Sequence, residues 1–246
     1  MENVLYLAMT AAEFRENGAL YPHLAWMACH FSPYGTGLSN LPTQLPRGSI
    51  LMLNDRTPVF GHDPQLIARQ LAEVAAQLEC SGILLDLQRP PEPQATAIAE
   101  AVSAVDCPVA ITPQYAQGLE CALFLPSVPL TTTPEAYFSP WKGREIWLEM
   151  ATEYACIRVT PEGSRQILCE KPPLPYLHAD EHLHCRYCMD VQQEHIDFHL
   201  CRDETMLQTL MEESEKLGVR RFVGLYQQLG QSFSQPMAQD TARFQD

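Results

Sequence analysis

The sequence predicts an α/β protein: a barrel of eight parallel strands of the (β/α)8 kind, with antiparallel hairpins added in its C-terminal half. Eight short apolar runs are spaced along the chain. Helical periodicity separates the runs of the first half, as in parallel βαβ units. The length of 246 residues suits one such barrel, which commonly needs ~250 residues.

The first half of the chain alternates strands with helices. Thr10 is a typical N-cap for a helix that ends at Gly18. Pro64–Leu78 and Ala95–Val105 carry apolar residues at the period of helices packed on a sheet. The strands predicted in this half are Val4–Met9, His23–Leu38 (which runs into a glycine-rich turn), Ile50–Asp55, Ser81–Gln88 and Pro108–Thr112.

The second half has fewer helices and two hairpin patterns. Cys121–Leu125, Glu145–Met150 and Arg221–Gly230 are the last three predicted strands. Ala155–Leu168 and Cys185–Cys201 alternate around polar turns, which indicates antiparallel hairpins. We therefore expect one barrel domain over residues 1–230, with a hairpin insertion at about 155–201 and a flexible tail over 231–246.

Composition excludes several classes of partner. The net charge of −14 disfavours binding to nucleic acid or to an anionic membrane surface. No apolar run approaches the ~18 residues of a membrane span, and the start of the chain lacks the basic segment of a secretion signal. Nine cysteines, an odd number, fit reduced thiols and a cytoplasmic location.

The fourth predicted strand, Ser81–Gln88, is the stretch around which the site is organised. Its apolar run indicates a strand buried on both faces, and Pro90-Pro91 ends it. Asp86 and Gln88 are two residues apart and therefore point to the same side. They fall at the carboxyl end of a parallel strand, where barrels bind their ligands.

This strand resembles the fourth strand of glycoside hydrolase family 18, the chitinase-like TIM barrels, which carries Asp-Gly-x-Asp-x-Asp-x-Glu. Gly82 and Asp86 match that motif, Ser81 and Leu84 replace its first two aspartates, and Gln88 replaces the catalytic glutamate. The segment from Phe31 into the glycine turn is similar to the spore-type branch of the family. The final strand resembles the family's closing Gly-x-x-x-Trp-x-Leu-Gly, with Tyr226 in place of the tryptophan.

The resemblance implies a degenerate active site. In family 18 the glutamate protonates the glycosidic oxygen, while the third aspartate orients the acetamido group of the sugar. A glutamine has no carboxylic proton to give, so we expect a pseudoenzyme that binds a carbohydrate or a related small molecule. Two alternatives stay open: an active glycosidase that uses Asp86 with another carboxylate such as Glu149, and a protein-interaction scaffold that uses the hairpins.

Further polar and aromatic residues lie at or just past predicted strand ends and would line one mouth of the barrel. Aromatic rings there stack on sugars, and amides or carboxylates bind hydroxyl groups. The catalytic candidates are Asp86, Gln88 and Glu149. The ligand-binding candidates are His30, Tyr34, Asp55, Gln114, Tyr115 and Tyr226.

The second hairpin region is rich in histidine and cysteine. Cys185 and Cys188 would face opposite sides of a strand, so we expect an ordinary exposed hairpin without a metal ion. The sequence has no glycine-rich phosphate loop and no Gly-x-Ser-x-Gly elbow, and we expect no cofactor. The residues of this group are His178, His182, His184, Cys185, Cys188, His195, His199 and Cys201.

Overall fold

The computed structural model describes residues 4–59, 61–170 and 178–230, so the expected tail over 231–246 lies outside the described residues. The chain divides into two compact units. The first contains the residues up to Pro126, Arg144–Glu149 and those from Val219 onward, and the second contains Ser127–Gly143 and Met150–Gly218. No helix among the described residues is long and apolar enough to cross a membrane.

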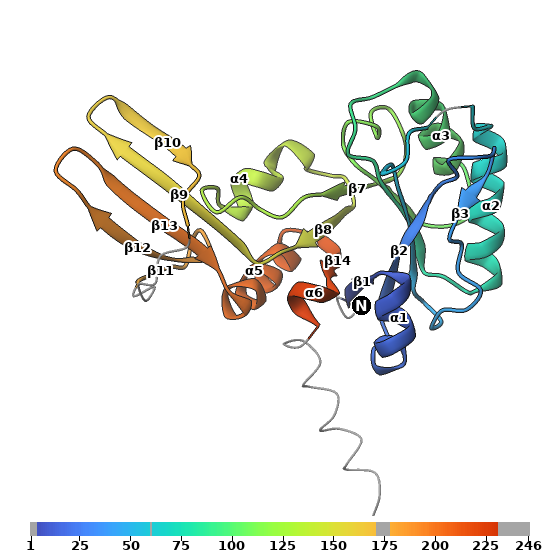
Figure 1. The fold of residues 1–246 in the computed structure, drawn as a ribbon, viewed down its shortest axis with the longest axis horizontal. Helices are drawn as coiled ribbons and strands as arrows, with labels where there is room; N and C mark the ends of the chain where they lie inside the picture. The colour runs from blue at the N-terminus through green and yellow to red at the C-terminus, as the bar shows by residue number, and fades with distance from the viewer. Residues whose placement is uncertain (1–3, 60, 171–177, 231–246) are drawn as a thin grey trace, which may run out of the picture. The chain divides into compact units, whose positions relative to one another are not determined.

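Eight parallel strands close into a barrel, which confirms the predicted fold class (Figure 1). The strand order is β1-β14-β8-β7-β6-β5-β4-β2, and β2 pairs with β1 to complete the ring. A short β3 (Leu38–Ser39) pairs antiparallel with β2. The barrel strands are β1 (Val4–Met9), β2 (Leu24–Phe31), β4 (Ile50–Asn54), β5 (Gly82–Asp86), β6 (Val109–Ile111), β7 (Ala122–Leu125), β8 (Ile146–Met150) and β14 (Val219–Leu225).

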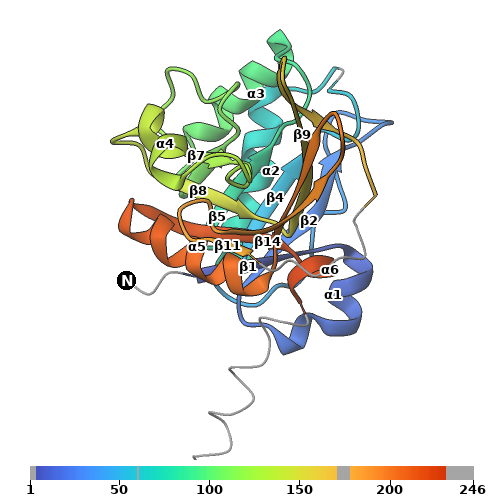
Figure 2. The same ribbon diagram turned by 90° about the vertical axis from the view of Figure 1, so that its left-hand side faces the viewer.

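The helices of the first unit follow the predicted periodicity. Thr10 caps α1 (Ala11–Asn17) through a capping box with Glu13, as its position indicated, and the short η1 (Gly18–Leu20) continues the turn. α2 (Pro64–Gln77) packs against α3 (Pro93–Ser103) on the outside of the barrel (Figure 1). α6 (Tyr226–Leu229) lies beside α1 in both views (Figures 1 and 2).

The eighth strand is shorter than predicted. It ends at Leu225, and Tyr226–Leu229 forms the helical turn α6, so the extension of the strand to Gly230 is wrong. The amide of Gly230 donates to the Tyr226 carbonyl at 2.8 Å, which closes that turn. Tyr226 and Leu229 share one face of the turn because they are three residues apart.

Alternate residues of the strands point inward and fill the barrel. The inner core includes Ile50 and Met52 of β4, Leu84 of β5 and Trp147 of β8. Since side chains alternate along a strand, the next inward positions toward the carboxyl end are Asn54, Asp86 and Glu149. The carboxyl end of the barrel, which we call the mouth, is therefore polar inside, whereas the layers below it are largely apolar.

The second unit is built on a five-stranded antiparallel sheet of order β10-β9-β13-β12-β11 (Figure 1). The two predicted hairpins, β9–β10 and β12–β13, are confirmed. Leu130, Cys185 and Leu200 form the small core of this unit. Its elements are β9 (Glu153–Thr160), β10 (Gly163–Ile167), β11 (His178–Asp180), β12 (Cys185–Val191), β13 (Ile196–Arg202), α4 (Pro134–Phe138), η2 (Ser139–Trp141) and α5 (Glu204–Lys216).

Candidate functional site

Three polar residues from neighbouring strands form a row on the inner wall of the mouth. His30 of β2 is the register partner of Asn54, and Asn54 is the partner of Asp86. Register partners on parallel strands point to the same side, and neighbouring strands are ~4.8 Å apart. All three are half-buried, whereas Cys29 and Phe31, which flank His30, are fully buried.

A β-bulge in β2 sets the direction of His30. The register between β2 and β4 shifts between Trp26 and Cys29, where β2 has one extra residue. The side-chain amide of Asn54 donates to the carbonyls of Met27 and Cys29, at 3.0 and 3.1 Å. His30 Nδ1 lies 2.9 Å from the Ala28 carbonyl, which can only accept, so Nδ1 is the donor in this bond.

Asp86 and Gln88 interact directly, as their spacing predicted they could. Asp86 is the last residue of β5, and Gln88 Nε2 donates to Asp86 Oδ1. Burial raises the pKa of the Asp86 carboxyl; the bond from Gln88 opposes this effect, and the charge of Asp55 adds to it. The mouth thus holds a partly desolvated aspartate that shares a hydrogen bond with an exposed amide.

Three of the predicted ligand-binding residues hold the loop that carries Gln88. The buried Asp55 accepts from the backbone amides of Gln88 and Arg89, at 3.1 and 2.8 Å. Gln114 Nε2 donates to the Leu87 carbonyl at 2.7 Å. The Tyr115 hydroxyl lies 3.1 Å from the carbonyls of both Arg89 and Pro90. These side chains position the loop after β5 through its backbone.

The remaining candidates lie in different surroundings. Glu149 is on the inner face at the end of β8 and is half-buried. Tyr34 follows β2 in a turn and is 98% exposed. Tyr226 is in α6, where its ring packs edge-on against Tyr21 with centroids 5.7 Å apart. The structure therefore joins Asp86 and Gln88 by a hydrogen bond and places His30 two strands away in the same row, and Glu149 enters the same mouth from β8.

The second unit has a pocket of about 520 Å³ lined by polar side chains. Burial raises the pKa of Glu153 in this pocket, and the nearby Arg202 guanidinium and the hydrogen bond with Ser127 oppose the shift. Arg202 is fully buried and donates to the carbonyls of Val128, Leu183 and His184. Arg202 therefore ties the segments of this unit together.

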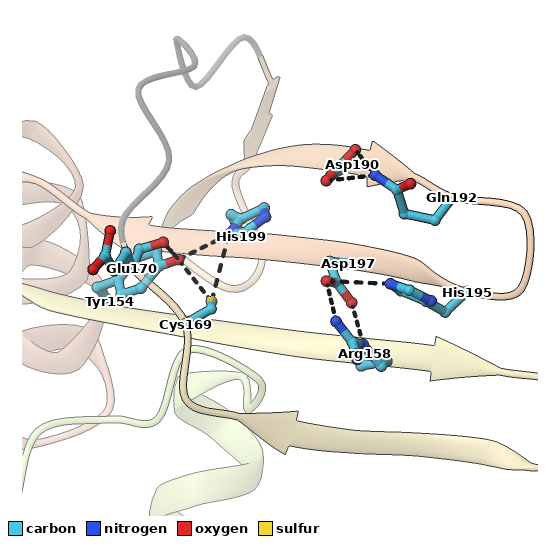
Figure 3. Close-up of polar contacts among 9 residues, drawn as sticks. All are labelled: Tyr154, Arg158, Cys169, Glu170, Asp190, Gln192, His195, Asp197 and His199. Carbon is cyan, nitrogen blue, oxygen red and sulfur yellow. Dashed lines mark hydrogen bonds and ion pairs between the residues drawn. The ribbon is translucent and has the colours of Figure 1, made fainter.

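A polar cluster lies on the antiparallel sheet (Figure 3). The Tyr154 hydroxyl is 2.8 Å from His199 Nδ1 and 3.1 Å from Cys169 Sγ. Further along the sheet, Arg158 of β9 forms a bidentate ion pair with Asp197 of β13, with both hydrogen bonds at 2.8 Å. This arrangement lowers the pKa of Asp197, chiefly through the bond from Arg158.

Several residues of these clusters could not be predicted from the sequence. Of the cysteine- and histidine-rich group, His199 lies beside Cys169 and Cys156, neither of which belonged to that group. Cys156 and His199 are opposite each other on β9 and β13, a relationship that only the strand pairing reveals. Asn54 was also missed; its place at the end of a buried strand, next to Asp55, was the available signal.

The fold places the barrel in a known structural class. No protein-family model matches the sequence, and no curated protein matches it. Solved structures do match, and they define the barrel as a TIM barrel like those of GH18 chitinases and of a spore cortex-lytic enzyme. The suspected similarity is therefore confirmed at the level of the fold.

Three solved structures illustrate the match. A class V chitinase from Nicotiana tobaccum aligns with a TM-score of 0.55 and 10% identity, over 91% of this chain and 93% of that chain. A GH18 chitinase from Cycas revoluta gives 0.53 and 10%, over 97% and 99%. The spore cortex-lytic enzyme SleL of Bacillus cereus gives 0.50 and 9%, over 90% and 70%. The structures from tobacco and Cycas are glutamate-to-glutamine variants in complex with NAG4 and (GlcNAc)4, respectively.

Proposed function

We propose that the barrel binds an N-acetylated saccharide at its mouth and does not hydrolyse it. The observation that carries this proposal is the hydrogen bond between Gln88 and Asp86 at the carboxyl end of β5. An amide offers both donors and an acceptor, and a carboxylate offers acceptors. Together with His30, the pair supplies the polar groups that sugar hydroxyl and acetamido groups require.

The absence of hydrolysis follows from the chemistry of Gln88. In the family 18 motif that this strand resembles, the position of Gln88 holds the glutamate that protonates the leaving oxygen. An amide cannot act as that acid. A positioned general acid typically contributes ~10²–10⁴-fold to the rate. Among the described residues, Asp86 is the only carboxylate that is hydrogen-bonded to the Gln88 side chain. In that bond Asp86 is the acceptor and Gln88 is the donor.

The related structures support retention of a ligand by such a site. The tobacco and Cycas chitinases were both solved with a glutamine in place of a glutamate and with a tetrasaccharide bound. A barrel of this fold can therefore hold a chito-oligosaccharide while it carries such a replacement. Gln88 is the residue that stands at the glutamate position of the motif in this chain.

Calorimetric titration with N,N′,N″,N‴-tetraacetylchitotetraose tests the proposal. We expect saturable binding by the wild type and at least ~10-fold weaker binding by Asp86→Ala, which corresponds to about 1.4 kcal/mol. Asp106→Asn is the matched control, because Asp106 is exposed and precedes β6 at the opposite end of the barrel. Absence of saturable binding by the folded wild type, or equal binding by Asp86→Ala, would refute the proposal.

A glycosidase is the second candidate, and the raised pKa of Asp86 is the observation that favours it. A carboxyl that stays protonated to higher pH can serve as a general acid, and Glu149 enters the same mouth as a second carboxylate. Dye release from an N-acetylated aryl glycoside separates the two functions. Turnover that is lost in both Asp86→Asn and Glu149→Gln would establish the enzyme.

A further inference from the structure

Two cysteines and a histidine converge on one face of the antiparallel sheet. The ligand atoms of Cys156, Cys169 and His199 all lie within 4.8 Å of one another. Cys156 on β9 is directly opposite His199 on β13. Cys169 follows the end of β10, whose last residue, Ile167, pairs with Cys156. Two strands and the segment that follows β10 therefore contribute one ligand each to the same point.

The spacing of Cys169 and His199 suits a tetrahedral ion. Zinc bonds to sulfur at ~2.3 Å and to imidazole nitrogen at ~2.0–2.1 Å, which places a sulfur and a nitrogen on the same ion about 3.6 Å apart. Cys169 Sγ and His199 Nδ1 are 3.8 Å apart. Only a few tenths of an ångström separate the observed spacing from the required one.

We propose that Cys156, Cys169 and His199 bind one Zn²⁺ ion. Thiolate and imidazole are the ligands that zinc prefers, and two thiolates neutralise its charge, which reduces the cost of placing the ion in a buried site. Cys156 and His199 are 1% and 7% exposed, so the ion is shielded from solvent on the sheet side.

Tyr154 supplies an oxygen beside the cluster. Its hydroxyl contacts both Cys169 Sγ and His199 Nδ1, at 3.1 and 2.8 Å (Figure 3). Tyr154 and Cys156 are two residues apart on β9 and so share a face. The tyrosine hydroxyl therefore borders the proposed site, and it also donates to the Glu170 carbonyl at 3.1 Å. The ion has a structural role: it ties β9, β13 and the segment after β10 together.

The test uses full-length protein that has been reduced and stripped of metal with a chelator. We expect one Zn²⁺ per chain in competition with a chromogenic chelator, and a higher melting temperature with zinc. Cys169→Ser and His199→Gln should each lower the affinity by more than ~100-fold, since even partners outside the coordination sphere cost 10–100-fold. Co²⁺ in place of zinc should give thiolate charge-transfer and tetrahedral d–d bands, which Cys169→Ser abolishes.

Cys188→Ser and His195→Gln are the matched controls. Cys188 is also a register partner of His199, but on β12, and His195 lies on the same hairpin; neither belongs to the three-residue cluster. Both should retain zinc affinity. Cys169 is only half-buried, so its variant should fold, which circular dichroism can verify. Failure of the reduced wild type to take up zinc, uptake unchanged in both ligand variants, or a Cys156–Cys169 disulfide in place of the site would overturn the proposal.

Discussion

The guanidinium group of Arg221 lies over the indole ring of Trp147, 4.4 Å from its centroid. The pair fills the inside of the barrel next to Gly82. A Cβ atom at Gly82 would lie 2.6 Å from Trp147 Cη2 and 2.9 Å from the Pro108 carbonyl. The glycine that this strand shares with the family 18 motif is therefore required here for packing.

Replacement of Gly82 by alanine should destabilise the barrel by ~1–3 kcal/mol, because the added methyl group overpacks a closed interior. Urea unfolding monitored by tryptophan fluorescence measures the change. Gly35→Ala is the control, since the nearest atom to its Cβ, Ser32 Oγ, is 3.6 Å away. Equal stability of the two variants would show that Trp147 can move aside without cost.

Asp86→Asn should change how stability depends on pH. Burial raises the pKa of Asp86, so the folded protein holds this proton more tightly than the unfolded chain. Ionisation of Asp86 therefore destabilises the fold as the pH rises from the ordinary aspartate value of ~3.9 through the raised one. Relative to wild type, the variant should gain stability between pH 3 and pH 7. Melting temperatures of wild type and variant are measured at pH 3 and at pH 7, with Asp106→Asn as the control for the lost charge. A difference between wild type and variant that is the same at both pH values would show that Asp86 is solvated.

Arg202→Ala should unfold the second unit readily. The Arg202 side chain is 0% exposed, donates to three carbonyls and lies 3.5 Å from Glu153. Its removal leaves buried carbonyl groups without a donor, and each such unsatisfied group costs ~1–3 kcal/mol. The exposed pair of Lys216 and Glu213 provides the control, because Lys216→Ala should cost ~0–1 kcal/mol. Similar melting temperatures for the two variants would contradict the assigned role of Arg202.

Gln88→Glu should fold normally and gain little hydrolysis of an N-acetylated aryl glycoside. The new carboxyl would sit beside Asp86, and a nearby like charge raises a carboxyl pKa, as a general acid needs. However, Leu84 is part of the apolar core and Ser81 is bonded to Tyr6 and Arg221, so the other two aspartates of the motif have no replacement. We expect the gain to stay below the ~10²–10⁴-fold of a full general acid.

Dye release by Gln88→Glu is compared with wild type and with the double variant Gln88→Glu, Asp86→Ala. The small gain should disappear in the double variant if Asp86 orients the ligand. Persistence of the gain there would remove Asp86 from the site, and an unfolded single variant would identify Gln88 as a structural amide.

The barrel could be predicted because its strands are buried on both faces. Such strands appear as uninterrupted apolar runs, and the prolines after Gln88 marked the end of β5. The spacing of Asp86 and Gln88 then placed both at the mouth. The end of β14 was less clear, since Tyr226–Leu229 is as compatible with a helical turn as with a strand.

The roles of individual mouth residues depend on contacts that the sequence does not encode locally. Asp55, Gln114 and Tyr115 all follow strand ends, but only the structure shows that their polar atoms contact the backbone of the loop after β5. The bulge in β2 is likewise invisible in the apolar pattern, and it makes Asn54 a partner of β2 carbonyls. The cluster at His199 required the pairing of distant strands.

The two bonds from Asp55 to the loop after β5 have a consequence for binding entropy. A loop that a ligand must order on arrival weakens association by ~0.5–1.5 kcal/mol for each side chain that becomes immobilised. Here Asp55 fixes the backbone of Gln88 and Arg89 as soon as the chain folds. Under the proposed function, a saccharide at Asp86 and Gln88 would meet a backbone that is already ordered, and its binding would carry no cost for ordering that loop.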